Sequence, residues 1–198
     1  MKKIITMNKE KIQLMFLNGE DNNKIFQLAC RYGYVDIIEE LYPTNNVDCA
    51  FGFQHACQGG QIDIVKFFIS KGIHKSKWGF QRACKGGHLE IVKLLLLSGE
   101  YIYNEGFKNA CIGGHIEIVK MMISLGIDNY NDGFQYACKN GHVETVKLLC
   151  PYIRVFNMGF YIACIHGHNE IIKLLISKIS NYNLALQGVC TYGDKEFV

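Results

Sequence analysis

The sequence has very little proline and lacks long charged runs and long apolar runs. Only two prolines occur in 198 residues, and hydrophobic residues make up 49% against 20% charged, so the chain is too apolar to be disordered and can bury a core. The formal charge is only +3 and Lys and Arg form no long run, which argues against a nucleic-acid partner or a polybasic membrane surface.

Sequence signals for export, membrane insertion and catalysis are also missing. The apolar N-terminal stretch is broken by Asn-Lys-Glu-Lys at 8–11, which leaves neither a secretory h-region nor a membrane span there. The patterns G-x-x-x-x-G-K-[ST], H-E-x-x-H and G-x-S-x-G do not occur. We therefore expect a soluble cytoplasmic protein that is not an enzyme.

Nine cysteines are present, but none forms a C-x-x-C pair. Seven of them recur at one spacing along the chain: Cys30, Cys57, Cys84, Cys111, Cys138, Cys164 and Cys190. Equivalent positions of stacked helical repeats lie roughly 10 Å apart, whereas a disulfide needs Cα atoms closer than about 7 Å. We predict free, buried thiols in a reducing compartment.

One segment is copied along the chain. GFQHACQGGQIDIVKFF, beginning at Gly52, returns as GFQRACKGGHLEIVKLL, GFKNACIGGHIEIVKMM, GFQYACKNGHVETVKLL and GFYIACIHGHNEIIKLL. The phenylalanines that mark the register are 27 residues apart, with one interval of 26: Phe26, Phe53, Phe80, Phe107, Phe134 and Phe160. A repeat array of this kind builds an extended surface before it builds a pocket.

Each copy is predicted to form an antiparallel helix pair. Phe80, Ala83 and Cys84 follow helical spacing, and the glycine three residues later suits the left-handed position past a helix C-terminus. A second apolar helix runs from Leu89 to about Ser98, with an acidic residue in its first turn and a lysine three residues later. The glycines expected to end the first helices are Gly33, Gly60, Gly87, Gly114, Gly141, Gly167 and Gly193.

A helix pair of this size cannot bury its apolar stripe alone, so neighbouring copies must stack into one core. We expect an all-α solenoid with about six full units and a partial seventh, formed by an N-terminal capping segment (1–24) and a repeat array (25–198). The partial unit is either a C-terminal cap or part of a longer array.

The string A-C-K-G-G-H-L-E-I-V-K-L-L-L at 83–96 resembles the A-A-x-x-G-H-x-E-I-V-K-L-L-L core of ankyrin repeats. Gly79 stands where that family has Pro, Phe80 where it has Leu, and Cys84 where it has a second Ala. The units are six residues shorter than the usual 33, which implies short loops in place of β-hairpin fingers. A leucine-rich repeat is excluded because no unit shows its alternating strand motif.

The shortened units, rich in Asn, Ile, Lys and Tyr, look like the ankyrin-repeat proteins of giant amoeba-infecting viruses. That resemblance implies a host-cell cytoplasmic setting and contact with host or viral proteins.

The ankyrin resemblance also implies a structural role for the His four residues after each Cys. Because a helix-ending glycine separates each Cys from its His, we expect no metal site and no cofactor. A zinc or thiol enzyme that uses these repeated Cys and His residues is kept as an alternative.

Positions that differ between the copies are the candidates for partner binding. Residues just before the helix-ending glycines face the concave groove in ankyrin repeats, and the connecting loops add aromatic side chains of the kind that carry interface energy. The predicted partner-binding residues are Trp78, Lys85, Tyr101, Tyr103, Ile112, Tyr130, Lys139 and Ile165.

The sequence thus predicts a monomeric scaffold that binds a protein across its concave face. An adaptor that recruits substrates to a host ubiquitin ligase is the alternative. A second reading of the loop aromatics, in which they cover the edge of the core between adjacent units, stays open.

Overall fold

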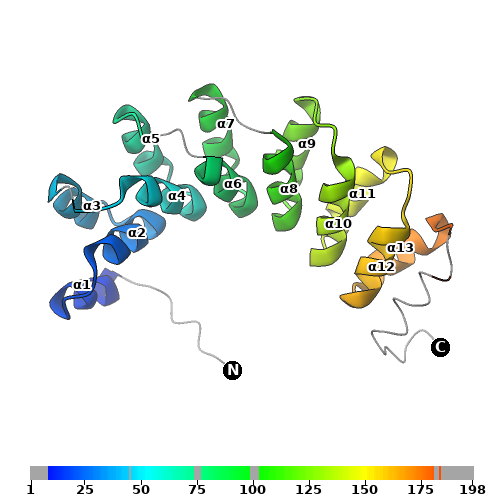
Figure 1. Ribbon diagram of the computed structural model, residues 1–198, viewed down its shortest axis with the longest axis horizontal. Helices are drawn as coiled ribbons and strands as arrows, with labels where there is room; N and C mark the ends of the chain where they lie inside the picture. Colours follow the sequence, from blue (N-terminus) through cyan, green and yellow to red (C-terminus); the bar gives the residue numbers. More distant parts are fainter. Residues whose placement is uncertain (1–8, 45, 74–76, 99–102, 181–182, 184–198) are drawn as a thin grey trace. The chain divides into compact units, whose positions relative to one another are not determined.

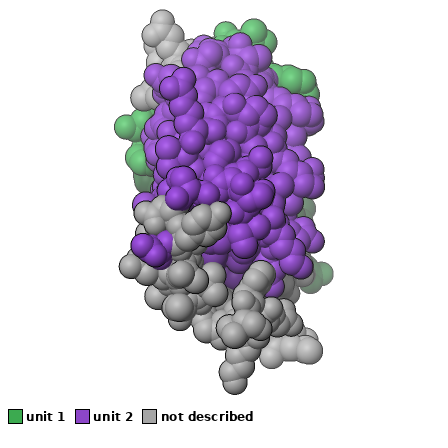
Figure 2. Space-filling view, turned by 90° about the vertical axis from the view of Figure 1, so that its right-hand side faces the viewer, with its two compact units in different colours: residues 1–101 green, residues 102–198 purple. Residues whose placement is uncertain are grey.

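The computed structural model describes residues 9–44, 46–73, 77–98, 103–180 and 183. Over these residues the chain is helical and contains no strand, as the repeat pattern predicts. It divides into two compact units, unit 1 (residues 1–101) and unit 2 (residues 102–198) (Figure 2). In the part described, no helix is both long and apolar enough to cross a bilayer.

In each unit, helix pairs follow one another along the chain (Figure 1). We call the first helix of each pair an A helix and the second a B helix. The A helices of unit 1 are α2 (Asn22–Tyr32), α4 (Cys49–Gly59) and α6 (Lys77–Gly86), and its B helices are α3 (Val35–Leu41), α5 (Ile62–Ser70) and α7 (Leu89–Ser98). The A helices of unit 2 are α8 (Tyr103–Gly113), α10 (Tyr130–Asn140) and α12 (Asn157–Ile165), and its B helices are α9 (Ile116–Ser124), α11 (Val143–Leu149) and α13 (Asn169–Leu175).

Helix α1 (Lys9–Leu17) precedes the first pair and packs against α2. It buries Ile12 and Met15, and Lys9 forms an ion pair of 2.8 Å with Asp36 of α3. In the described part of the chain, three short 3₁₀ turns extend B helices or their connections: η1 (Tyr42–Thr44), η2 (Cys150–Tyr152) and η3 (Ile176–Lys178). The capping role of 1–24 and the extent of the array stay predictions.

The glycine that ends each A helix adopts the predicted left-handed conformation. Six of the seven have φ between 68° and 84°, while Gly193 lies outside the described residues. At Gly33 the backbone N–H donates to the Ala29 carbonyl, 2.9 Å away, which satisfies one of the carbonyls left open at the helix end. Only one residue separates this glycine from the B helix that follows, so the two helices of a pair must run back along each other.

Adjacent A helices pack through the Gly-Phe step of the repeat. A Cβ at Gly79 would lie 2.6 Å from Cε1 of Phe53, and one at Gly52 would lie 2.5 Å from Cε1 of Phe26. The aromatic ring of one repeat therefore occupies the space where a side chain of the next repeat would be. This contact explains why glycine stands where the ankyrin pattern has proline.

The core of both units consists of the repeat Phe, Ala and Cys with the apolar residues of the B helices. All cysteines among the described residues are free thiols, as predicted. On the outside of the B helices, the predicted acid–lysine pairs form at 2.8 Å (Glu90 with Lys93) and 2.6 Å (Glu144 with Lys147). These exposed pairs each contribute only a few tenths of a kcal/mol.

Candidate functional site

The residues predicted just before the helix-ending glycines lie in the last turns of A helices. Lys85 (α6) and Lys139 (α10) are exposed, and Ile112 (α8) and Ile165 (α12) are partly buried. They occupy the position five residues after the repeat Phe. The position two residues after that Phe is on the same side of the helix, about one turn earlier. We call these two positions of the A helices the A face.

The predicted loop aromatics lie elsewhere than expected. Trp78, Tyr103 and Tyr130 are in the first turns of α6, α8 and α10, so their placement in connecting loops was wrong. Helix α10 begins earlier because a side chain caps its N-terminus: Asn129 accepts from the Asp132 backbone N–H. Trp78 is 55% exposed and Tyr103 39% exposed. Tyr101 lies outside the described residues.

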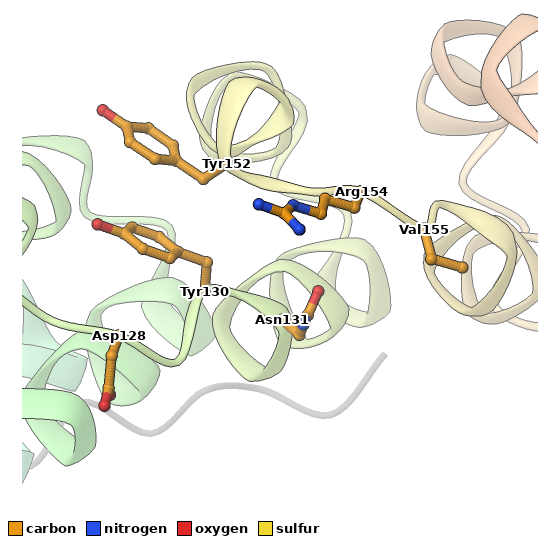
Figure 3. Close-up of a pocket in the computed structure, with 6 residues that line it drawn as sticks. All are labelled: Asp128, Tyr130, Asn131, Tyr152, Arg154 and Val155. Atoms are coloured by element: carbon orange, nitrogen blue, oxygen red, sulfur yellow. The ribbon is translucent and has the colours of Figure 1, made fainter.

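Tyr130 stacks on Tyr152 of η2, a residue that sequence analysis missed. Their ring centroids are 4.6 Å apart and the planes differ by 8°, while Phe107 meets the Tyr130 ring edge-on. In Figure 3 the two hydroxyls point to the same side and the Arg154 guanidinium is turned toward the ring pair. A shallow pocket of about 200 Å³ is lined by Tyr130, Tyr152 and Arg154 together with Asp128, Asn131 and Val155.

The structure does not bring all the predicted residues into one cluster. Tyr130 and Lys139 are at opposite ends of α10, which places them about 14 Å apart along the helix axis. Trp78 and Lys85 belong to unit 1, and the other described ones belong to unit 2. Each unit therefore has its own candidate surface.

In unit 2 the A face is hollowed. A depression of about 270 Å³ is lined by Asp132, Gln135, Tyr136 and Lys139 of α10 and by Ile162 of α12. The Lys108 ammonium of α8 lies 5.9 Å from the centre of the Tyr136 ring, within cation–π range. Aromatic, apolar and charged groups from three consecutive A helices thus meet around Tyr136.

In unit 1 the A face carries two arginines and a histidine. Arg82 of α6 donates from Nη1 to Oε1 of Gln58 of α4, 3.0 Å away. His55 of α4 has a buried Nδ1 with no hydrogen-bond partner among the described residues. Burial lowers the pKa of His55, and the charges of Arg82 and Arg31 lower it further. Sequence analysis missed this group, although the position two residues after the repeat Phe differs in every copy, which was the available signal.

The comparison with known families settles the fold family. A sequence profile of ankyrin repeats (3 copies) matches residues 26–106, 55–132 and 80–185, which together span most of the chain. The chain belongs to the ankyrin-repeat family. Ankyrin repeats are generally protein–protein interaction modules and non-catalytic scaffolds. A search of curated proteins found no match.

In this ankyrin-repeat chain the repeated histidines join neighbouring repeats. The Nε2–H groups of His88, His142 and His168 donate to A-helix carbonyls of the preceding repeat at 2.9–3.0 Å. Gln61 takes this role earlier in unit 1, donating from Nε2 to the Arg31 carbonyl at 3.2 Å. A ring nitrogen that donates to a carbonyl of the preceding repeat holds the two repeats together, which is the structural role that the resemblance implied.

The repeated cysteines are unsuited to nucleophilic chemistry. Burial raises the pKa of Cys57 and Cys111 to about 12 and that of Cys164 to about 11. Because the thiolate is the nucleophile and the metal ligand, a raised pKa removes the reactive form at neutral pH. Among the residues that the structure describes, no three His, Cys, Asp or Glu side chains are grouped as metal ligands would be.

Proposed function

We propose that this ankyrin-repeat chain is a non-catalytic module that binds a protein partner on its A faces. One observation carries the proposal: the copies agree at their core positions and differ on the A face. Two residues after the repeat Phe stand Leu28, His55, Arg82, Asn109, Tyr136 and Ile162; five residues after it stand Arg31, Gln58, Lys85, Ile112, Lys139 and Ile165. A surface that varies on a constant frame can match one partner specifically.

The composition of the A face supports this role. Tyr136, Arg82 and Ile162 are partly exposed there, and Tyr and Arg are the residue types over-represented among interface residues with large binding energies. The B helices instead repeat the same exposed pairs, such as Glu117 with Lys120 at 2.8 Å. Such pairs give solubility and weak helix support but little information for recognition.

The thiol-enzyme alternative receives no support from the buried cysteines. The ligase-adaptor alternative, the giant-virus origin and the cytoplasmic setting stay predictions. The last of these is consistent with the free thiols of the described residues.

Affinity capture from a cell lysate tests the proposal. The intact chain is compared with the variant Tyr136→Ala/Lys139→Ala, altered on the A face, and with Lys120→Ala/Lys147→Ala, altered on the B helices of the same unit. We expect a defined set of captured proteins that the first variant loses and the second retains, with helicity unchanged in both by circular dichroism. Equal capture by all three forms would contradict the proposal, and ubiquitin-ligase subunits in the lost set would favour the adaptor.

A further inference from the structure

The charges of unit 1 are separated between its two helix layers. Its A helices α2, α4 and α6 contain five basic residues and no acidic one: Lys24, Arg31, Lys77, Arg82 and Lys85. Its B helices contain five acidic residues, Asp36, Glu39, Glu40, Asp63 and Glu90, against Lys66 and Lys93. In unit 2 the A helices are balanced, with Glu105 and Asp132 against Lys108 and Lys139.

Three consecutive A helices bring the central part of this basic layer together. The end of α4 approaches α2 so closely that a Cβ at Gly59 would collide with the Arg31 carbonyl. From the other side, α6 reaches α4 through the hydrogen bond from Arg82 to Gln58. His55 lies within the electrostatic range of both guanidinium groups, and these are the charged groups that face it from α2 and α6.

The two arginines of this layer differ from Lys24 in their ion pairing. No ion pair joins Arg31 or Arg82 to a carboxylate of the described residues, whereas Lys24 pairs with Glu20 at 2.6 Å. Arg31, in the last turn of α2, also complements the helix macrodipole. Arg82 lies a turn before the end of α6, where that effect is small, so helix stabilisation does not account for it.

We propose that the A face of unit 1 binds an acidic protein segment, with carboxylates of the partner placed at Arg31 and Arg82. This inference rests on the proposed function and specifies its partner by charge complementarity. Guanidinium groups bind carboxylates through paired, charge-assisted hydrogen bonds. Exposed apolar rings on the same helices, Phe51 at 47% and Trp78 at 55%, supply contacts for apolar residues of the segment.

A protein segment fits this surface better than a nucleic acid does. Nucleic acids bind through many phosphate contacts along a basic track. Here the cations are few and alternate with neutral side chains such as Gln58, and Asp21 and Asp48 cap the N-termini of α2 and α4. A bound carboxylate also offsets the charges of Arg82 and Arg31, which lower the pKa of His55.

Selection from a random peptide library on the intact chain tests the inference. Three adjacent helices span about 20 Å, so peptides of about ten residues are long enough to cross them when extended. The variant Arg31→Gln/Arg82→Gln is compared with Lys66→Gln/Lys93→Gln, which removes the same charge from B helices of the same unit. Circular dichroism confirms that both variants keep their helices.

We expect Asp and Glu to be enriched in the selected peptides, and we expect binding to the arginine variant to be weaker by about tenfold or more. The lysine variant should bind as the native chain does. Peptides without acidic enrichment, or equal binding to the arginine variant, would overturn the inference. If such peptides instead lose binding with Tyr136→Ala, the proposed function stands and only the acidic partner fails.

Two further measurements sharpen the result. A partner carboxylate should raise the depressed pKa of His55 in the complex, so proton uptake accompanies binding and affinity for a selected peptide should increase as the pH falls below neutral. His55→Gln should remove that increase, and a pH response unchanged by His55→Gln would count against the carboxylate at this site. The binding of an oligothymidylate is measured in the same way. If it binds more tightly than the peptides, with a steep salt dependence that the arginine variant lacks, the partner of this face is a nucleic acid and not an acidic protein segment.

Discussion

We expect the buried thiols to make this chain sensitive to alkaline solution. Six cysteines, one in each repeat, have burial-raised pKa values: Cys30, Cys57, Cys84, Cys111, Cys138 and Cys164. In the unfolded chain these thiols ionise near their ordinary pKa of 9.0, whereas Cys164 in the folded chain ionises only at about 11. Above pH 9 the unfolded state therefore binds fewer protons than the folded state, and stability falls as the pH rises.

The size of this effect follows from the number of thiols. Each one lowers the free energy of unfolding by about 1.4 kcal/mol for every pH unit between the two pKa values. Cys57, Cys111 and Cys164 together account for about 4 kcal/mol at pH ~10, and all six for about 8 kcal/mol. The total stability of a typical domain is only about 5–15 kcal/mol, so unfolding should occur at a pH where an ordinary helical protein is still folded.

Urea unfolding followed by circular dichroism, at a series of pH values and with a reductant present, measures this loss. The variant Cys57→Ala/Cys111→Ala/Cys164→Ala has the residue of the ankyrin pattern at these positions and should lose stability with about half the native slope above pH ~9. Parallel slopes for the native chain and the variant would refute the reasoning, because the thiols would then not be the groups that titrate.

Further predictions concern single contacts, each measured by the urea midpoint at neutral pH. Gly79→Ala should lower the free energy of unfolding by about 1 kcal/mol, because the crowding of Phe53 costs about 1–3 kcal/mol and the higher helix propensity of alanine offsets about 1 kcal/mol of it. Adding Phe53→Leu to this variant should cancel much of the crowding cost. A single Gly79→Ala variant that is more stable than the native chain would contradict this contact between Gly79 and Phe53. Thr145→Val should stabilise by about 1 kcal/mol, because the buried hydroxyl has no hydrogen-bond partner among the described residues; an unchanged midpoint would mean that the hydroxyl is satisfied. His142→Ala should lower the free energy of unfolding by about 1–2 kcal/mol, because it leaves a carbonyl of the preceding repeat unpaired. An unchanged stability would show that His142 does not hold the two repeats together.

Periodicity predicted the frame of the fold well. The spacing of Phe80, Ala83 and Cys84 identified a buried stripe, and all three side chains are at most 1% exposed. The helix-ending glycines were also correct, because φ near +75° is a conformation that glycine alone adopts without strain.

The starts of the A helices were predicted less well. Trp78, Tyr103 and Tyr130 precede the apolar stripe, so periodicity gave no sign that the helix already includes them. At α4 and α10 the capping residues carried that information: Asp48 accepts from the Phe51 backbone N–H at 3.0 Å, and Asn129 accepts from the Asp132 backbone N–H.

The group around His55 was missed for a different reason. Its members come from different repeats and different positions: Arg31 is five residues after its Phe, and Arg82 is two residues after its Phe. A comparison of equivalent positions does not show that these side chains face each other across α4. Tyr152 was missed because it follows Pro151 in a 3₁₀ turn, outside the register of the repeat.

Site-specific photocrosslinking shows whether the A face, rather than the B helices, contacts a protein. A photoreactive phenylalanine derivative is placed at Tyr136 on the A face or at Lys120 on a B helix of the same unit, and the products are identified by mass spectrometry. We expect a defined protein to be crosslinked from Tyr136 and not from Lys120. Crosslinks to that protein from Lys120 alone, or to nucleic acid alone from Tyr136, would contradict it.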